Sequence, residues 1–249
     1  MQPLATRTKK SIDPLLKNEY SKKLFAKLGI RKPFVRQEKT KHYRMPVLEE
    51  NGGYRELKPY SGPEIPESEY TQLEYVTYPT DPDTFFAPLT SATGENILRG
   101  FWDFDKPDLD GIWTSNAEKC PTIVNYIKSI QNRYGRVQLI RMEPNSLREA
   151  RWGLHLDDNN RLNPETNGWV VRMWLELTDD RESSLILRED QFDGRNEVRI
   201  PLPKYAQVVV DSEYLFHGGY HKGPHTRYGL ITSFESTEHL DGWIRSQLA

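Results

Sequence analysis

One short stretch of this sequence, RWGLHLDD at residues 151–158, contains two residues that commonly bind metals. His155 and Asp157 lie two positions apart, so on a β-strand both side chains point to the same face. An imidazole nitrogen and a carboxylate oxygen would then lie side by side and could bind one metal ion. An H-x-D pair is common by chance, so it needs a third ligand from elsewhere in the chain.

His217 is the best candidate for that third ligand. It directly follows the apolar segment QVVVDSEYLF, and Arg227 comes ten residues later at the start of RYGLITSF. Two histidines and one carboxylate form a facial triad, which leaves coordination positions of iron(II) open. His221 and His225 are the alternatives, but we expect them to be loop residues near the cavity mouth. Arg227 suits bidentate pairing with a carboxylate, although a single arginine on a strand is more often a surface residue.

The order H-x-D, then several strands, then H-x10-R resembles the iron(II)/2-oxoglutarate-dependent oxygenase superfamily. The closest likeness is to the aspartyl/asparaginyl β-hydroxylase-like branch, which includes bacterial amino-acid hydroxylases. The matching parts are His155, the strand VVRMWLEL with Arg172, and VVVDSEYLFHGG with His217. The likeness covers residues 137–235, and the first 110 or so residues show none.

This resemblance implies that His155, Asp157 and His217 bind Fe(2+), with 2-oxoglutarate and dioxygen as cosubstrates and ascorbate as a stimulant. It implies that Arg227 binds the distal carboxylate of 2-oxoglutarate and that Arg172 assists. Part of the branch has R-x-H where this chain has Arg172-Met173-Trp174. Because an indole only donates hydrogen bonds, either that role has moved or Trp174 is a wall of the pocket. The presence of Asp157 favours hydroxylation over halogenation.

The implied activity is hydroxylation of an unactivated C–H bond in a small polar substrate, such as an amino acid or a natural-product intermediate. Alternatives are desaturation or cyclisation at the same iron, or a cupin-like metal isomerase or binding protein without 2-oxoglutarate. A further alternative is a basic-armed interaction protein whose barrel is only a scaffold. Arg227 distinguishes the 2-oxoglutarate-dependent enzymes from the cupin-like proteins, since a cupin without a 2-oxo acid needs no buried cation there.

Residues that contact the substrate are harder to predict. Arg148, Arg151 and Trp152 lie near the expected cavity, but each is equally typical of a surface charge or a core aromatic. The segment 99–113, RGFWDFDKPDLDGIW, is rich in aromatic and acidic residues. It is predicted either to be a lid that favours a cationic substrate or to be a surface loop.

Composition sets the broader class. The 249 residues are 36% hydrophobic and 28% charged, with a net charge of −2 and one cysteine, Cys120. No apolar run approaches the roughly 20 residues that span a bilayer, so we expect a cytoplasmic protein without membrane contact. Residues 7–44 are strongly basic, but they lack an aromatic platform or nucleic-acid motif, so nucleic acid is an unlikely partner. The sequence does not indicate an oligomeric state.

These candidate residues require a particular scaffold. Short β-type runs separated by Pro, Gly, Asn and Asp predict a mostly β fold with flanking helices and a double-stranded β-helix core of the jelly-roll or cupin-like kind. Residues 1–70 are predicted to form a basic N-terminal extension with a helix at 13–28 and an irregular linker at 45–70. Residues 71–249 are predicted to form the oxygenase domain, with its core at 137–235. Expected elements of this domain are a helix at 116–134 and strands at 72–78, 97–104, 137–142, 169–177, 183–188, 197–202, 206–211 and 228–235.

Overall fold

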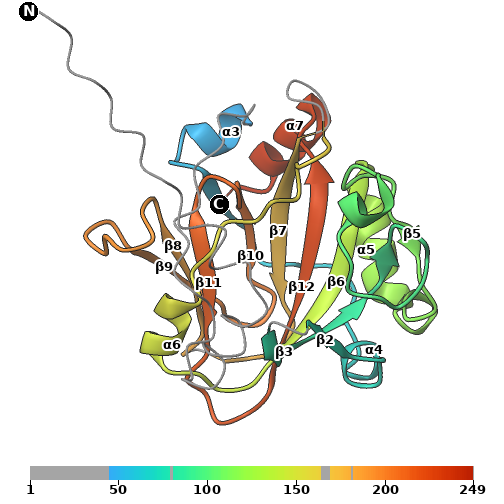
Figure 1. Ribbon diagram of the computed structural model, residues 1–249, viewed down its shortest axis with the longest axis horizontal. Helices are drawn as coiled ribbons and strands as arrows, with labels where there is room; N and C mark the ends of the chain where they lie inside the picture. Colours follow the sequence, from blue (N-terminus) through green and yellow to red (C-terminus); the bar gives the residue numbers. More distant parts are fainter. Residues whose placement is uncertain (1–44, 79–80, 164–168, 181, 249) are drawn as a thin grey trace, which may run out of the picture. The chain divides into compact units, whose positions relative to one another are not determined.

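A large antiparallel sheet dominates the computed structural model, which describes residues 45–78, 81–163, 169–180 and 182–248 (Figure 1). The expected helix at 13–28 and the basic segment 7–44 lie outside these residues. The sheet has the strand order β1-β10-β7-β12-β6-β3-β2. Its strands are β1 (Tyr54–Leu57), β2 (Val76–Tyr78), β3 (Asp81–Pro88), β6 (Tyr134–Met142), β7 (Val170–Glu176), β10 (Gln207–Val210) and β12 (Arg227–Glu235).

A second, three-stranded sheet lies against one face of the large sheet. It has the order β11-β8-β9, with β8 (Ser184–Arg188), β9 (Val198–Pro201) and β11 (Phe216–Tyr220). Apolar side chains from both sheets, among them Ile140, Leu185 and Val208, form one buried cluster. The protein is therefore mostly β with a jelly-roll core, as the sequence predicts. A separate two-stranded ribbon pairs β4 (Thr90–Ser91) with β5 (Ile112–Trp113).

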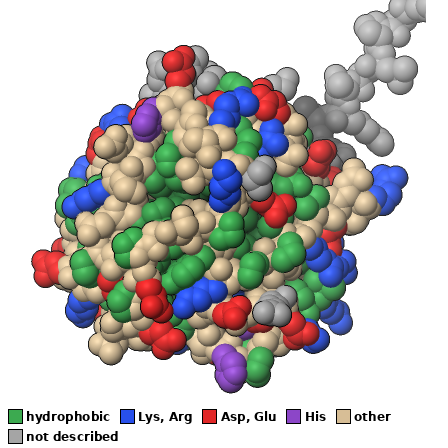
Figure 2. Space-filling view, turned by 180° about the vertical axis from the view of Figure 1, so that it is seen from behind, with side chains coloured by type: hydrophobic (Ala, Val, Ile, Leu, Met, Phe, Trp, Pro, Cys, Tyr) green, Lys and Arg blue, Asp and Glu red, His purple; other side chains and the backbone are tan. Residues whose placement is uncertain are grey.

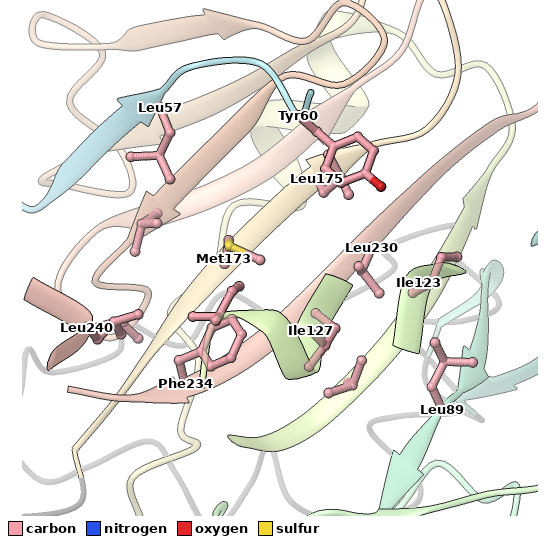
Figure 3. Packing of buried hydrophobic residues seen from close by; sticks show 14 of the residues in the cluster. Leu57, Tyr60, Leu89, Ile123, Ile127, Met173, Leu175, Leu230, Phe234 and Leu240 are labelled. Carbon is pink, nitrogen blue, oxygen red and sulfur yellow. The ribbon is translucent and has the colours of Figure 1, made fainter. Parts of the chain in front are cut away.

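The two faces of the large sheet differ because side chains alternate along each strand. In β7, Met173 and Leu175 point into the cluster beneath the helices, which Figure 3 shows together with Leu230 and Phe234 of β12. Trp174 lies between them in sequence and packs in the cluster between the two sheets. One face of β7 thus packs in the core, and the other lines the interior of the jelly roll.

Helices cover the outer face of the large sheet. They are α3 (Pro46–Glu49), α4 (Ser68–Thr71), α5 (Pro121–Ser129) and α7 (Glu238–Ser246). Ile123, Ile127 and Ile130 share the buried face expected of a helix in this region. The helix begins at Pro121 rather than at Asn116, because the buried Glu69 carboxylate accepts the backbone N–H groups of Thr122 and Ile123.

Three expectations for the first half of the described chain are wrong in detail. Residues 97–104 do not form a strand; instead a 3₁₀ helix, η1 (Phe101–Phe104), begins after Gly100, whose N–H is accepted by Asp103. The segment 45–70 is not wholly irregular, because it contains α3, β1 and α4, and β1 is an edge strand of the large sheet. The predicted strand 72–78 is present only as β2, from Val76.

No helix among the described residues is long and apolar enough to cross a membrane. On the face seen in Figure 2, acidic and basic side chains are interspersed among apolar and neutral ones.

Candidate metal centre

His155 and Asp157 lie on an extended segment beside the small sheet. Their neighbours Leu154 and Leu156 pack with Ala150 of helix α6 (Leu147–Trp152) in a buried cluster outside the small sheet. Alternation along the extended chain therefore turns His155 and Asp157 together toward the interior. Their shared face agrees with the spacing in the sequence.

His217 reaches the same place from β11. Its neighbour Phe216 packs in the outer cluster with Leu154, so His217 points inward. A short antiparallel bridge joins the two segments: the His155 N–H donates to the His217 carbonyl at 3.2 Å, and the His217 N–H donates to the His155 carbonyl at 3.0 Å. This pairing sets the two rings 4.6 Å apart, centroid to centroid.

The ligand atoms of His155, Asp157 and His217 all lie within 4.8 Å of one another, and these three residues form the one such group found among the described residues. His155 Nε2 is 3.9 Å from Asp157 Oδ1, and His217 Nε2 is 3.8 Å from Asp157 Oδ2. These spacings are wider than hydrogen bonds and suit three atoms that surround one ion. The imidazole and carboxylate donors fit iron(II).

Both histidines are held in the tautomer that metal binding needs. His155 Nδ1 lies 2.8 Å from the Gly153 carbonyl oxygen, and His217 Nδ1 lies 3.2 Å from the Leu215 carbonyl oxygen. Because a carbonyl only accepts, each Nδ1 carries the proton and each Nε2 presents its lone pair to the site. Backbone carbonyls thus orient both rings before any ion binds.

Arg172 fixes the carboxylate of the triad. Its Nε donates to Asp157 Oδ2 at 2.9 Å, while its other nitrogens donate to Ser233 Oγ and Asn159 Oδ1, both at 2.8 Å. Burial by itself raises the pKa of Asp157, but Arg172 and the two histidines outweigh it, so this pKa lies well below its usual range. Asp157 is therefore a carboxylate ready for a cation. In this arrangement Arg172 contacts a metal ligand, whereas the resemblance implies a contact with cosubstrate.

Arg227 is buried deeper in the jelly roll and is paired with an acid. Its Nε donates to Glu176 Oε2 at 2.8 Å, and its Nη2 lies 2.7 Å from the same oxygen without hydrogen-bond geometry. The side chains of Arg227 and Glu176 are 1% and 0% exposed. Nη1 reaches the Tyr220 carbonyl at 3.3 Å, and an added Cβ on Gly219 would lie 3.9 Å from Nη1. Since Gly219 is two residues from His217 on β11, the end of the guanidinium faces the same interior as the triad.

Trp174 lies on the inner face of β7, between Arg172 and Glu176, the partner of Arg227. Its Nε1 donates to Glu176 Oε2 at 3.2 Å, and its ring centroid is 5.1 Å from Arg227 Cζ. The ring also covers Gly229, where an added Cβ would approach Trp174 to 2.5 Å. Trp174 is therefore a wall of the interior, one of the two roles considered from the sequence.

The three residues predicted to contact substrate all lie on α6. Arg151 makes two hydrogen bonds with Glu197, of 2.9 and 2.8 Å, and Glu197 also pairs with Arg188 and Arg199. Arg148 is exposed, and Trp152 is 56% exposed. These contacts anchor α6 to the β8–β9 hairpin, and a role for the three residues in substrate binding stays a prediction.

His221 and His225, the rival ligands, lie apart from the triad. Buried His221 contacts Asp180 and Ser183 through Nδ1, at 2.6 and 3.0 Å. Both histidines line a cavity of about 320 Å³ that also touches Arg227, Thr178 and Tyr70. His155, Asp157 and His217 do not line this cavity.

Glu213 is an acid near the triad that the sequence did not single out. Its Oε1 accepts the Asn160 N–H at 2.7 Å. Burial, with a contribution from Asp157, raises the pKa of Glu213 to about 7.

We expect Glu213→Gln to flatten the pH dependence of stability in metal-free protein. The folded state binds more protons than the unfolded state between about pH 4.5 and pH 7, so this group lowers stability as the pH rises through that window. The loss of unfolding free energy between about pH 5 and pH 8 should shrink by on the order of 2 kcal/mol in the variant. Urea unfolding at several pH values measures it, with the exposed Glu118→Gln as control. Equal pH slopes for wild type and Glu213→Gln would contradict the expectation.

Several residues that shape the site were not predicted. Ser233 and Asp108 continue the chain that holds Arg172, because Ser233 Oγ donates to Asp108 Oδ2 at 3.0 Å. Glu176, the partner of Arg227, also lies outside the predicted set. No local pattern marks Ser233 or Asp108, because their partners come from strands and loops distant in sequence.

No protein-family model matches this sequence, and no curated protein matches it. Among solved structures, it is similar to an oxidoreductase of the 2OG-Fe(II) oxygenase family from Burkholderia pseudomallei. That match has 14% identity over 69% of this chain and 76% of the other, with a TM-score of 0.45. It is also similar to a Trichoplax adhaerens prolyl hydroxylase in complex with a hypoxia-inducible-factor peptide fragment. This match has 13% identity over 78% of this chain and 89% of the other, with a TM-score of 0.43. A third similar structure is HygX from Streptomyces hygroscopicus with nickel, 2-oxoglutarate and hygromycin B bound. This match has 13% identity over 75% of this chain and 84% of the other, with a TM-score of 0.42. Matches at these identities do not assign an activity to this chain.

Proposed function

We propose that this protein is a mononuclear non-haem iron(II), 2-oxoglutarate-dependent oxygenase that hydroxylates an unactivated C–H bond of a small polar substrate. The observation that carries the proposal is the convergence of His155, Asp157 and His217 with both Nδ1 atoms already bound to carbonyls. The Nε2 atoms of both histidines lie beside the Asp157 carboxylate, whose pKa is lowered, and this is the arrangement that metal binding needs.

The triad would hold iron on one side and leave its other side open to ligands. Bound iron would supply activation of dioxygen, coupled to oxidative decarboxylation of 2-oxoglutarate to succinate and carbon dioxide. The protein's own part is to orient the three ligands, keep Asp157 ionised through Arg172, and place the substrate carbon near the site.

Arg227 can still bind the distal carboxylate of 2-oxoglutarate despite its pairing with Glu176. Glu176 occupies the side edge of the guanidinium, formed by Nε and Nη2, with a single oxygen. The other edge of the guanidinium is formed by Nη1 and Nη2. Nη2 makes no hydrogen bond, and Nη1 has a second N–H besides the one that it donates to the Tyr220 carbonyl, so both can bind a ligand. This edge faces Gly219, and the Met142 side chain also lies there, because an added Cβ on Gly219 would meet Met142 Cε at 2.7 Å.

The Glu176 contact also supports a second candidate, a metal enzyme of the cupin kind without 2-oxoglutarate. Glu176 already neutralises Arg227, so the arginine has a structural partner without any cosubstrate. The two candidates share the metal centre and differ only in what Arg227 binds.

Anaerobic titration of metal-free protein with iron(II), and then with 2-oxoglutarate, separates the two candidates. An open facial triad that chelates 2-oxoglutarate gives a weak visible charge-transfer band, and we expect wild type to show it. Succinate release in air is the second readout, and mass spectrometry of a turned-over substrate tells hydroxylation from desaturation or cyclisation. Iron binding without the band, and without succinate, would leave only the metal enzyme without 2-oxoglutarate.

A further inference from the structure

The inner face of β6 carries two polar residues that the metal centre does not use. Alternation places Arg136, Gln138, Ile140 and Met142 on this face, because Val137 and Leu139 pack in the core under the helices. Ile140 and Met142 belong to the apolar cluster between the sheets. Arg136 and Gln138 continue the same row with a cation and an amide.

Neither polar side chain has a hydrogen-bond partner within the described part of the chain. Gln138 is 5% exposed. Arg136 Nη2 is fully buried and also lacks an acceptor. A buried donor without a partner costs roughly 1–3 kcal/mol, so Arg136 Nη2 indicates a group kept for a ligand.

Aromatic and basic side chains surround these donors. Arg136 and Gln138 line a small cleft together with Tyr78 and Phe101. The Trp102 ring lies 5.7 Å from Arg136 Cζ and 5.9 Å from Arg161 Cζ. Residues of the segment 99–113 therefore cover the cleft, and this agrees with the lid that is one of the two roles predicted for the segment.

Two acids near the cleft, Asp108 and Asp157, are already committed, while Asp158 also interacts with Arg136 and Arg161. Asp108 Oδ1 accepts the Arg136 backbone N–H at 2.7 Å, and its Oδ2 accepts Ser233 Oγ. Asp157 is held by Arg172 and faces the metal position. Burial by itself lowers the pKa of Arg136, but Tyr78, Asp108 and Asp157 outweigh it, so the guanidinium is a full cation.

The cleft lies near the triad on the inner face of the large sheet. Ser233 pairs with Arg172 across β12 and β7, and its other neighbour in the sheet is β6 near Arg136. Arg136 is therefore two strands from Arg172, about 10 Å across the sheet. Arg136 also interacts electrostatically with Asp157, so its guanidinium lies near the metal position.

We infer that Arg136 and Gln138 bind a carboxylate of the substrate, and that Phe101 and Trp102 cover its apolar part. The inference rests on the proposed function and names the substrate class: a small organic acid whose reacting carbon is several atoms from its carboxylate. A guanidinium and an amide N–H together match the two oxygens of a carboxylate. The acidic content of segment 99–113 thus does not select a cationic substrate.

Calorimetric titration of metal-free, full-length protein with hexanoate tests the inference, because chelator removes direct metal binding. Wild type should bind hexanoate, and hexanamide, its uncharged isostere, at least tenfold more weakly. Arg136→Ala should weaken hexanoate binding at least tenfold, Arg136→Lys less, and Gln138→Leu severalfold. Arg195→Ala, whose parent side chain is 87% exposed, should leave binding unchanged.

One further readout and one further probe make the outcome specific. Arg136→Ala should keep the iron–2-oxoglutarate band, which shows that the variant is folded and separates this inference from the proposed function. The inference is overturned if Arg136→Ala binds hexanoate as wild type does, if hexanamide binds equally well, or if inorganic phosphate binds in place of hexanoate.

Discussion

His217→Ala should lower iron(II) affinity roughly 100-fold to 1000-fold and abolish succinate release. Structural zinc sites with four protein ligands bind the metal with about 10–16 kcal/mol, about 3–4 kcal/mol per ligand, and this is an upper bound for iron(II), which binds the same donors less tightly. The loss should be of that size because His217 brings a preoriented Nε2, held by the Leu215 carbonyl, to the triad. Anaerobic competition against a chromophoric chelator measures the affinity.

His225→Ala is the matched control for that experiment. His225 is exposed and lies in the same region of the chain, and its contact with His221 is made by its backbone carbonyl, which alanine retains. Iron affinity should therefore be unchanged. If His225→Ala lost iron and His217→Ala kept it, the assignment of the third ligand would be reversed.

The triad could be predicted from the sequence because each of its parts has a local signal. His155 and Asp157 share a face through a spacing of two, and His217 follows an apolar strand. The strands of the second half could be predicted for the same reason, because the alternation of apolar and polar residues is visible in consecutive positions. Even there, β11 was missed: Gly218 and Gly219 suggest a turn, but they pair with β8.

What the sequence could not supply was the set of partners of each charged residue. Arg172 and Arg227 are both inward-facing arginines, and nothing local tells that one binds Asp157 and the other Glu176. These pairs depend on strand register between segments many residues apart. Arg136 and Gln138 did carry a usable signal, because polar residues alternate there with Val137 and Leu139.

Removal of one partner from the buried pair of Arg227 and Glu176 should cause the largest loss of stability near the site. Arg227→Gln leaves an unpaired carboxylate with 0% exposure, and Glu176→Gln leaves an unpaired guanidinium with 1% exposure. Removal of one partner from such a pair costs about 3–5 kcal/mol of unfolding free energy. Urea denaturation of metal-free protein measures each loss.

The double variant Arg227→Gln/Glu176→Gln separates the structural role of Arg227 from cosubstrate binding. Both charges disappear together, and the amide that replaces the Glu176 carboxylate can accept from Trp174 through its oxygen and donate to Thr178 Oγ1 through its nitrogen. The double variant should therefore recover more than about 1 kcal/mol relative to either single variant. Its iron affinity should match wild type, because Arg227 contacts none of the three ligands. Its charge-transfer band with 2-oxoglutarate should be lost at concentrations that saturate wild type, since no cation then faces the distal carboxylate. A stable double variant that keeps the band would show that Arg227 serves the fold alone, and that another group holds the cosubstrate.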